Sequence, residues 1–249
     1  MSNLCLPIIG YMHSPYREKF GIPRQPNLVQ VESYIEMQAP YNDVLAFEGI
    51  EAFSHLWLIW QFHENKSKSD ETRFRAQVRP PRLGGNQKIG VFATRSMYRP
   101  APIGLSVVQL QRVEKQGKSV RVYVSGSDLL HGTPIVDIKP YIQYSDALPM
   151  AQSGYAQQAP TRKLVQWSAT AQQQQQDLLS LKLITTQVVQ ELEQVLALDP
   201  RPAYQQDQHR CYGMRFADLN VKFYIFAEHI EIEQLTLFEE NDLAQPDRA

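Results

Sequence analysis

The chain has 249 residues, of which 43% are hydrophobic and 20% charged, and its formal net charge is −1. These values are typical of a globular protein with one large domain or two small ones, and they argue against binding to nucleic acid through overall charge. Cys5 and Cys211 lie far apart and form no CxxC pair, which argues against a disulfide scaffold or a cysteine zinc site. The N-terminus lacks a signal-peptide pattern, and the longest apolar run, 56–60, is too short to cross a bilayer. We therefore expect a cytoplasmic protein.

The first 145 residues or so show short apolar segments separated by turn residues. Residues 53–62 form the most apolar of them, with Leu56, Leu58 and Trp60 on one face. Strands are also expected over 89–95 and 103–113, and residues 120–125 alternate with the period of a half-buried strand. Because no helical pattern intervenes, we expect an antiparallel barrel or sandwich.

The composition changes after this region. Residues 149–160 are rich in Ala, Gln, Ser and Pro and resemble a linker, and a short strand is expected over 164–169. Apolar residues at helical spacing predict one helix over 172–198, which Pro200 should end at Asp199. Strands over 221–225 and 230–237 complete the chain. The fold class is therefore mainly β: an N-terminal antiparallel β-barrel (1–148) followed by a smaller α+β domain (149–249).

Charge is distributed unevenly along the chain. Seven basic residues and no acidic one lie between Arg73 and Arg99, whereas the tail 228–247 is acidic. Such clustering makes a local field that can attract phosphates in a neutral protein. The alternative is a solvated basic face.

Common cofactor and catalytic motifs are missing from the sequence. It contains no GxGxxG after a strand, no GxxxxGK[ST], no GxSxG and no histidines at zinc-binding spacing, so no metal site is expected. Proline and glycine are instead unusually dense within 79–141. Such residues fix the backbone and admit close approach of a ligand, although they could equally form only barrel corners.

Seven segments closely resemble the TrmO family of β-barrel tRNA adenosine N6-methyltransferases. They are HSPY at 13–16, KFGIPRQP at 19–26, FSHLW at 53–57, RPPRLGG at 79–85, GVFATRS at 90–96, DIKPY at 137–141 and DPRPAY at 199–204. The resemblance covers nearly the whole chain. Two positions depart from the family pattern: Ala101 replaces the usual Asn of RPNPIG, and His131 replaces the usual Asp of DLLDGTP.

This resemblance implies methyl transfer from S-adenosylmethionine to N6 of N6-threonylcarbamoyladenosine, next to the tRNA anticodon, by a homodimer with its donor pocket near the subunit interface. Asp128 or Glu64 would hold the ribose hydroxyls or the ammonium group of the donor, and Arg95 its carboxylate. The implied donor pocket comprises Pro26, Asn27, Leu28, His63, Glu64, Arg95, Leu105, Ser125, Gly126, Ser127 and Asp128.

On the acceptor side, the resemblance implies that Asp199, Arg201 and Tyr204 act in catalysis. Arg201 would meet a phosphate or the threonyl carboxylate, and Tyr204 would stack on a base or bond N6. Purely structural alternatives exist for these positions. His63 could be satisfied inside the barrel, Glu64 and Asp128 could have surface or turn roles, and Asp199 could simply end a helix.

Two rival functions stay open at the level of sequence. One is a regulatory module that binds tRNA or S-adenosylmethionine without catalysis, against which the intact DPRPAY segment argues. The other is a methyltransferase for a different RNA or a small molecule; between these two substrates, the basic segment 73–99 weakly favours RNA.

Overall fold

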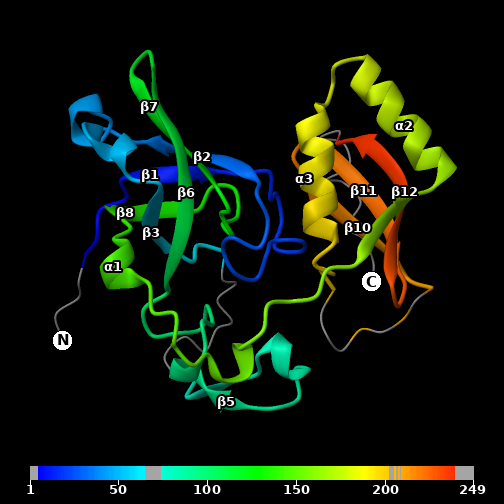
Figure 1. Ribbon diagram of the computed structural model, residues 1–249, viewed down its shortest axis with the longest axis horizontal. Coiled ribbons are helices and arrows are strands. Elements are labelled where there is room, and N and C mark those ends of the chain that lie inside the picture. The colour runs from blue at the N-terminus through cyan, green and yellow to red at the C-terminus, as the bar shows by residue number, and fades with distance from the viewer. Residues whose placement is uncertain (1–4, 65–73, 202–204, 206, 208, 239–249) are drawn as a thin grey trace. The chain divides into compact units, whose positions relative to one another are not determined.

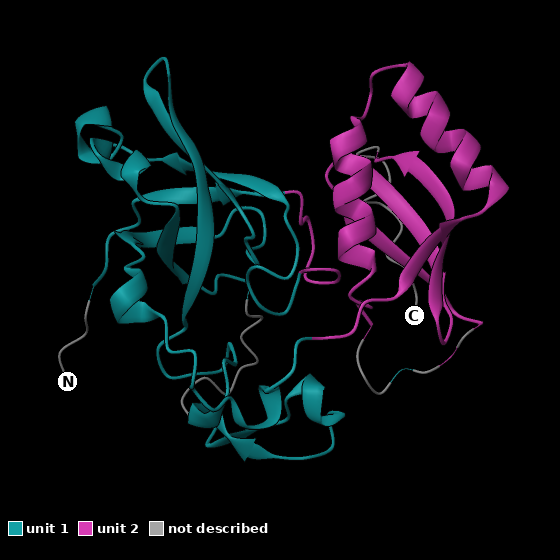
Figure 2. Ribbon diagram, viewed as in Figure 1, with its two compact units in different colours: residues 1–14, 23–159, 202–206 teal, residues 15–22, 160–201, 207–249 magenta. Residues whose placement is uncertain are grey.

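The computed structural model of the chain describes residues 5–64, 74–201, 205, 207 and 209–238. It divides into two compact units, drawn in different colours in Figure 2. Unit 1 comprises residues 1–14, 23–159 and 202–206, and unit 2 comprises residues 15–22, 160–201 and 207–249. No helix in the described ranges is both long and apolar enough to cross a membrane.

Unit 1 is built on a closed β-barrel, which confirms the predicted architecture (Figure 1). Its strands follow one another in the order β1-β2-β7-β6-β3-β8, and each pairs antiparallel with its neighbours. Closure leaves no sheet edge with unpaired backbone groups. The bounds are β1 Gly10–His13, β2 Glu32–Met37, β3 His55–Gln61, β6 Ile103–Gln116, β7 Ser119–Ser125 and β8 Pro134–Pro140.

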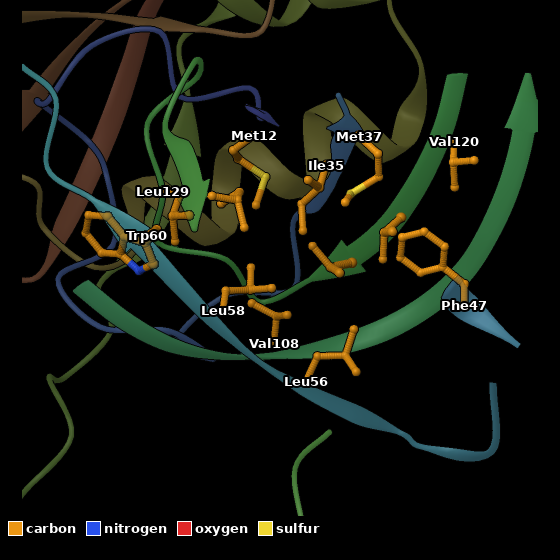
Figure 3. Close-up of a cluster of buried hydrophobic side chains, with 13 residues drawn as sticks. Met12, Ile35, Met37, Phe47, Leu56, Leu58, Trp60, Val108, Val120 and Leu129 are labelled. Atoms are coloured by element: carbon orange, nitrogen blue, oxygen red, sulfur yellow. The ribbon is translucent and has the colours of Figure 1, made fainter. Parts of the chain in front are cut away.

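The barrel core is formed by alternate residues of these strands, as the period of two requires. Leu56 and Leu58 of β3 are fully buried and Trp60 is nearly so, which confirms the face predicted for this strand. Figure 3 shows how they meet side chains from the other strands inside the barrel. Leu129, from the loop between β7 and β8, joins the same cluster and so anchors that loop to the core.

Shorter elements complete unit 1. The small strands β4 (Gln77–Val78) and β5 (Ile89–Gly90) pair antiparallel, and α1 (Gln143–Asp146) follows β8. The strand expected over 89–95 is therefore wrong beyond Gly90, because the chain turns there into a 3-10 helical turn. Such turns occur at Val44–Phe47, Ile50–Ala52, Pro81–Leu83, Val91–Ala93 and Gly154–Ala156.

Unit 2 is an α+β unit. Its sheet has the order β10-β11-β12-β9, in which β12 and β9 run parallel and the other pairs antiparallel. Helices α2 and α3 lie against the sheet (Figure 1). The bounds are β9 Leu164–Trp167, α2 Ala169–Ser180, α3 Thr186–Leu196, β10 Cys211–Phe216, β11 Leu219–Ile225 and β12 His229–Leu237.

The single helix expected over 172–198 is wrong in extent, because the chain breaks it into α2 and α3. Lys182 adopts a φ of +56°, which a helix cannot accommodate. Thr185 then caps α3, since its side-chain hydroxyl accepts a hydrogen bond from the Val188 amide. Helix α3 ends at Leu196, before the predicted end at Asp199.

Residues 15–22, which we call the strap, belong to unit 2 although they directly follow β1. Tyr16 forms an isolated antiparallel bridge with Phe216, and the Phe20 ring stacks on those of Tyr212 and Phe223. The Glu18 carboxylate accepts a hydrogen bond of 2.9 Å from the Arg215 amide. Unit 2 is thus completed by a segment about 200 residues distant in sequence.

Packing between β3 and β6 leads to a first prediction. Gly104 lies opposite Trp60, and a Cβ at this position would lie 2.2 Å from the indole ring. Because the ring or a strand would have to move, Gly104→Ala should lower the free energy of unfolding by about 1–3 kcal/mol in urea titration. Gly90→Ala is the matched control, since no atom lies within 4 Å of its added Cβ. Equal denaturation midpoints for the two variants would contradict the prediction.

Candidate functional site

The loop between β7 and β8 carries the most buried part of the predicted donor pocket. Gly126 begins it with a φ of +80°, a conformation that favours glycine. The buried Ser127 hydroxyl accepts a hydrogen bond of 3.2 Å from the Leu129 amide, and the Ser14 hydroxyl donates one of 2.8 Å to the Leu129 carbonyl. These bonds hold the backbone on both sides of Asp128, so that its carboxyl has a fixed position.

The Asp128 carboxyl ends a chain of hydrogen bonds from two barrel strands. Trp60 of β3 donates through its indole nitrogen to the Ser106 hydroxyl at 3.0 Å, and Ser106 of β6 donates to Asp128 Oδ1 at 2.6 Å. An indole nitrogen can only donate, so Ser106 must accept from it. The serine proton is therefore directed at Asp128, whose ionised form is the better acceptor.

Burial nevertheless disfavours that ionised form. It raises the pKa of Asp128 to about 6, against the opposing effects of the Ser106 hydrogen bond, the backbone and the positive charge of Arg95. The residue keeps partial solvent exposure, but its carboxyl is densely surrounded by protein atoms. A carboxyl with a pKa near neutrality at a partly open position is typical of functional sites.

Asn27 joins the predicted segment Pro26, Asn27 and Leu28 to this loop. Its amide donates to the Gly126 carbonyl at 2.8 Å, and its side-chain Nδ2 donates to the Val107 carbonyl at 2.9 Å. A Cβ on Gly126 would lie only 2.5 Å from Asn27 Oδ1. The structure therefore brings Asn27, Gly126 and Asp128 together, with half-buried Pro26 and Leu28 on either side of Asn27.

Arg95 is linked to the same region. It is exposed, and its guanidinium donates to the side-chain Oε1 of Gln25 at 2.6 Å, next to Pro26 in the chain. Its positive charge lowers the pKa of the Asp128 carboxyl, although burial has the larger, opposite effect. Leu105, the neighbour of Ser106, is 52% exposed.

Three other predicted pocket residues have different surroundings: His63 and Glu64 are exposed, and Ser125 is hydrogen-bonded in the barrel wall. His63 and Glu64 follow β3 and are exposed, so the alternative of a histidine inside the barrel is wrong. His63 lies beside the β7–β8 loop, with Nε2 within 3.9 Å of the position of a Cβ on Gly132. Ser125 is bonded within a glutamine cluster of the barrel wall, and its hydroxyl contacts the side chains of Gln30, Gln109 and Gln111.

The predicted acceptor residues that can be described form an ion pair in unit 2. Asp199 has a φ of +52° and accepts hydrogen bonds from Arg201 through both carboxylate oxygens, at 3.0 Å each for Nε and Nη2. Lys163 Nζ lies 3.5 Å from the same carboxylate. Asp199 thus fixes the Arg201 guanidinium, and the arginine side chain as a whole is only 14% exposed. Tyr204 lies outside the described residues.

Ser106 and Trp60 were not among the predicted site residues. A signal for Ser106 was present, because the alternation of β6 places it on the inward face with Val108. A buried hydroxyl needs a hydrogen-bond partner, which could have been sought among the polar residues of the neighbouring strands and loops. Trp60 gave no such signal, since its ring fits the apolar core.

The raised pKa of Asp128 gives a pH-dependent prediction. Because the folded form holds the proton more tightly than an unfolded chain with a pKa of 3.8, Asp128 contributes stability below pH 4 that is lost as pH rises through 6. Asp128→Asn should therefore gain up to about 3 kcal/mol of unfolding free energy relative to the unsubstituted protein between pH 4 and pH 7. Urea titration of both proteins across this range measures the difference.

Asp146 provides a matched control with the opposite sign. It also accepts a hydrogen bond from an indole, that of Trp57 at 2.9 Å, but the Ile142 amide and this indole lower its pKa. Asp146→Asn should therefore lose stability relative to the unsubstituted protein as pH rises through the carboxyl range. The account of Asp128 would be wrong if both variants showed the same pH trend.

Comparison with known proteins adds independent information. The family model for the tRNA-methyltransferase O N-terminal domain matches residues 11–147, and that for the TrmO C-terminal domain matches residues 160–237. The chain is 43% identical to tRNA (adenine(37)-N6)-methyltransferase of Escherichia coli, over 93% of this chain and 97% of that protein.

Two comparisons with Pseudomonas aeruginosa proteins agree with this result. A putative S-adenosylmethionine-dependent methyltransferase is 44% identical, over 87% of this chain and 90% of that protein. The crystal structure of TrmO superposes with a TM-score of 0.75 at 35% identity, covering 94% of this chain and 99% of that chain. Both family models, the full-length sequence match and the solved fold lead to the same conclusion: the chain belongs to the tRNA-methyltransferase O family.

Proposed function

We propose that the protein transfers a methyl group from S-adenosylmethionine to N6 of the adenine at position 37 of tRNA. The 43% identity to the Escherichia coli methyltransferase, over nearly the full length of both chains, carries this proposal. The name of the Pseudomonas aeruginosa relative supports the choice of donor. The resemblance to the TrmO family further implies that this adenine carries an N6-threonylcarbamoyl group.

The residues around Asp128 fit such a donor. S-adenosylmethionine is cationic at its sulfonium and ammonium groups and has a ribose diol, each of which a carboxylate complements. Asp128 is held ready as an acceptor by Ser106, and Gly126 lets the backbone approach closely where a side chain would collide with Asn27. Arg95, whose hydrogen-bond partner is the neutral Gln25, would hold the carboxylate of the methionine moiety.

Catalysis then depends mainly on alignment. When bound, S-adenosylmethionine supplies an activated methyl group whose leaving sulfur needs no protonation. The protein has to hold the methyl carbon and N6 in line, and exclude other geometries. The hydrogen-bond chain from Trp60 through Ser106 restrains Asp128, and with it the donor end of this alignment.

On the acceptor side, Arg201 would bind the threonyl carboxylate or a phosphate. Its pairing with both oxygens of Asp199 fixes the plane of the guanidinium and leaves Asp199 as a positioning residue. Tyr204 would stack on a base or form a hydrogen bond with N6. A proton acceptor near N6 would help, because the N6 lone pair is delocalised into the ring and the carbamoyl group.

Labelled transfer tests the proposal directly. Purified protein is incubated with methyl-labelled donor and with tRNA that carries or lacks the threonylcarbamoyl group, and labelled nucleosides are identified by mass spectrometry. We expect label only in the modified tRNA. Binding of both ligands without label would instead indicate a regulatory module, and label on another nucleoside or a small molecule would indicate a different substrate.

The acceptor assignment has its own variant. Arg201→Ala with Tyr204→Ala should lower the transfer rate about 100-fold or more while donor affinity stays unchanged, because the loss affects acceptor alignment. Arg210→Ala is the control: this exposed arginine of unit 2 lies over the Tyr212 ring, at 5.4 Å, and has no assigned role. Normal turnover by the double variant would refute the assignment.

We further propose a homodimer with the donor pocket near the subunit interface. This rests on the family resemblance, and the exposed Leu105 beside Ser106 is an apolar side chain that such an interface could cover. Light scattering at micromolar concentration should give twice the chain mass of 28.6 kDa. An active protein of monomeric mass would contradict the proposal.

We also propose a role for each of the two domains and a cellular location for the protein. Residues 1–148 would bind the donor, and residues 149–249 would present the acceptor loop. Cys5 and Cys211 are free, exposed thiols, which fits a reducing compartment such as the cytoplasm.

A further inference from the structure

Residues 74–99, which we call the basic-aromatic segment, combine positive charge with exposed rings. The segment contains no acidic residue. Its cations are Arg75, Arg79, Arg82, Lys88, Arg95 and Arg99. The proposed function uses only Arg95 of these, so the rest of the segment needs another explanation.

Three large aromatic side chains of the segment are turned to solvent. Phe74, Phe92 and Tyr98 are 56%, 67% and 48% exposed. The Phe74 and Phe92 rings are stacked with centroids 6.0 Å apart, because Phe74 precedes β4 and Phe92 follows β5 at the same end of this antiparallel pair. Clustered exposed rings of this kind mark an interaction surface, whereas single exposed apolar residues need no explanation.

Cations lie directly against these rings. The Arg75 guanidinium carbon is 4.7 Å from the Tyr98 ring centroid, and that of Arg99 is 5.4 Å from the Phe92 centroid. Arg99 also donates to the Thr94 carbonyl at 2.8 Å, which holds the turn that carries Phe92. The aromatic and basic groups are therefore parts of one surface.

Two further cations lie at the other end of the β4–β5 pair, which the loop 79–88 closes. Val78 pairs with Ile89, so Arg79, directly after Val78, and Lys88, directly before Ile89, are neighbours across the two strands. Both are exposed. Within the described ranges, neither these two nor the other cations of the segment form an ion pair with a carboxylate. As far as the described residues are concerned, their charge is available to an anionic partner.

We propose that the basic-aromatic segment is a docking surface for the unpaired loop of an RNA, on which bases stack against Phe74, Phe92 and Tyr98 while Arg79 and Lys88 contact phosphates. Stacking rings interleaved with cations is the chemistry that binds single-stranded nucleic acid. The inference rests on the proposed function and adds to it, because it assigns a substrate surface separate from Asp128 and from Asp199–Arg201. The net charge of −1 makes such a local surface necessary for binding a polyanion.

The test measures binding of a tRNA anticodon stem-loop by fluorescence anisotropy over a range of KCl concentrations, without methyl donor. Phe74→Ala with Phe92→Ala should weaken binding about tenfold or more, since it removes a stacking pair. Arg79→Gln with Lys88→Gln should weaken binding and reduce the slope of log affinity against log salt by about 1.4, the value for two lost phosphate contacts.

Matched controls lie outside the segment. Tyr144 is 94% exposed, and Lys118 is exposed in the turn between β6 and β7. Tyr144→Ala and Lys118→Gln should leave both affinity and salt slope unchanged. If the Phe74, Phe92 variant fails to fold, as judged by circular dichroism, the Arg79, Lys88 variant still tests the proposal because it changes only exposed polar ends.

Affinities within twofold of the unsubstituted protein for both double variants would overturn the inference. It would also be overturned if the aromatic variant kept its RNA affinity but lost its oligomeric state, because the surface would then be an interface between copies. Neither result would affect the proposed methyl transfer, which the labelling experiment judges. Conversely, RNA binding that depends on this surface, without any label transfer, would refute only the proposed function.

Discussion

The pairing of β1 with β8 is the interaction on which the barrel and its candidate site both depend. It closes the ring through Gly10 opposite Ile135 and Tyr11 opposite Pro134. The Gly132 amide, donating to the Met12 carbonyl at 2.8 Å, extends the contact into the β7–β8 loop. One short strand thus removes the open edge of the sheet and holds the end of the loop that carries Asp128. The pairing of β1 with β8 therefore both closes the barrel and helps to position the Asp128 carboxyl.

Residues that alternate along a single strand made the barrel predictable. Leu56, Leu58 and Trp60 are buried as their spacing indicated, and β12 follows the predicted segment closely. The break between α2 and α3 was not predictable from periodicity, because the apolar spacing continues across it while Lys182 leaves the helical conformation. Strand β10 was missed although Tyr212, Met214 and Phe216 alternate, since Cys, Gly and Arg between them dilute its apolar character. The spacing of apolar residues predicts which face of a helix or strand is buried better than it predicts where that helix or strand ends.

The candidate site, too, was predictable only in part. The resemblance to a family identified Asp128, Gly126 and Asn27, which the structure brings together, and Asp199 with Arg201, which form an ion pair. It could not supply the chain of hydrogen bonds from Trp60 through Ser106, because that chain depends on the register of β3 against β6. Nor could it indicate that the Ser125 hydroxyl lies among glutamine side chains. Motifs name residues that matter, whereas the protonation and orientation of each depend on neighbours that are distant in sequence.

The strap has a consequence for how the chain is made. Tyr16 and Phe20 leave the ribosome early, but their partners on β10 and β11 are synthesised about 200 residues later. During that interval the barrel strands can already pair with one another, while the strap between β1 and β2 has no sheet to cover. Its two aromatic side chains then lack the ring partners that they have in the folded unit. Completion of unit 2 waits for the last strands and buries a segment from the beginning of the chain. Folding of unit 2 therefore depends on contacts between segments about 200 residues apart.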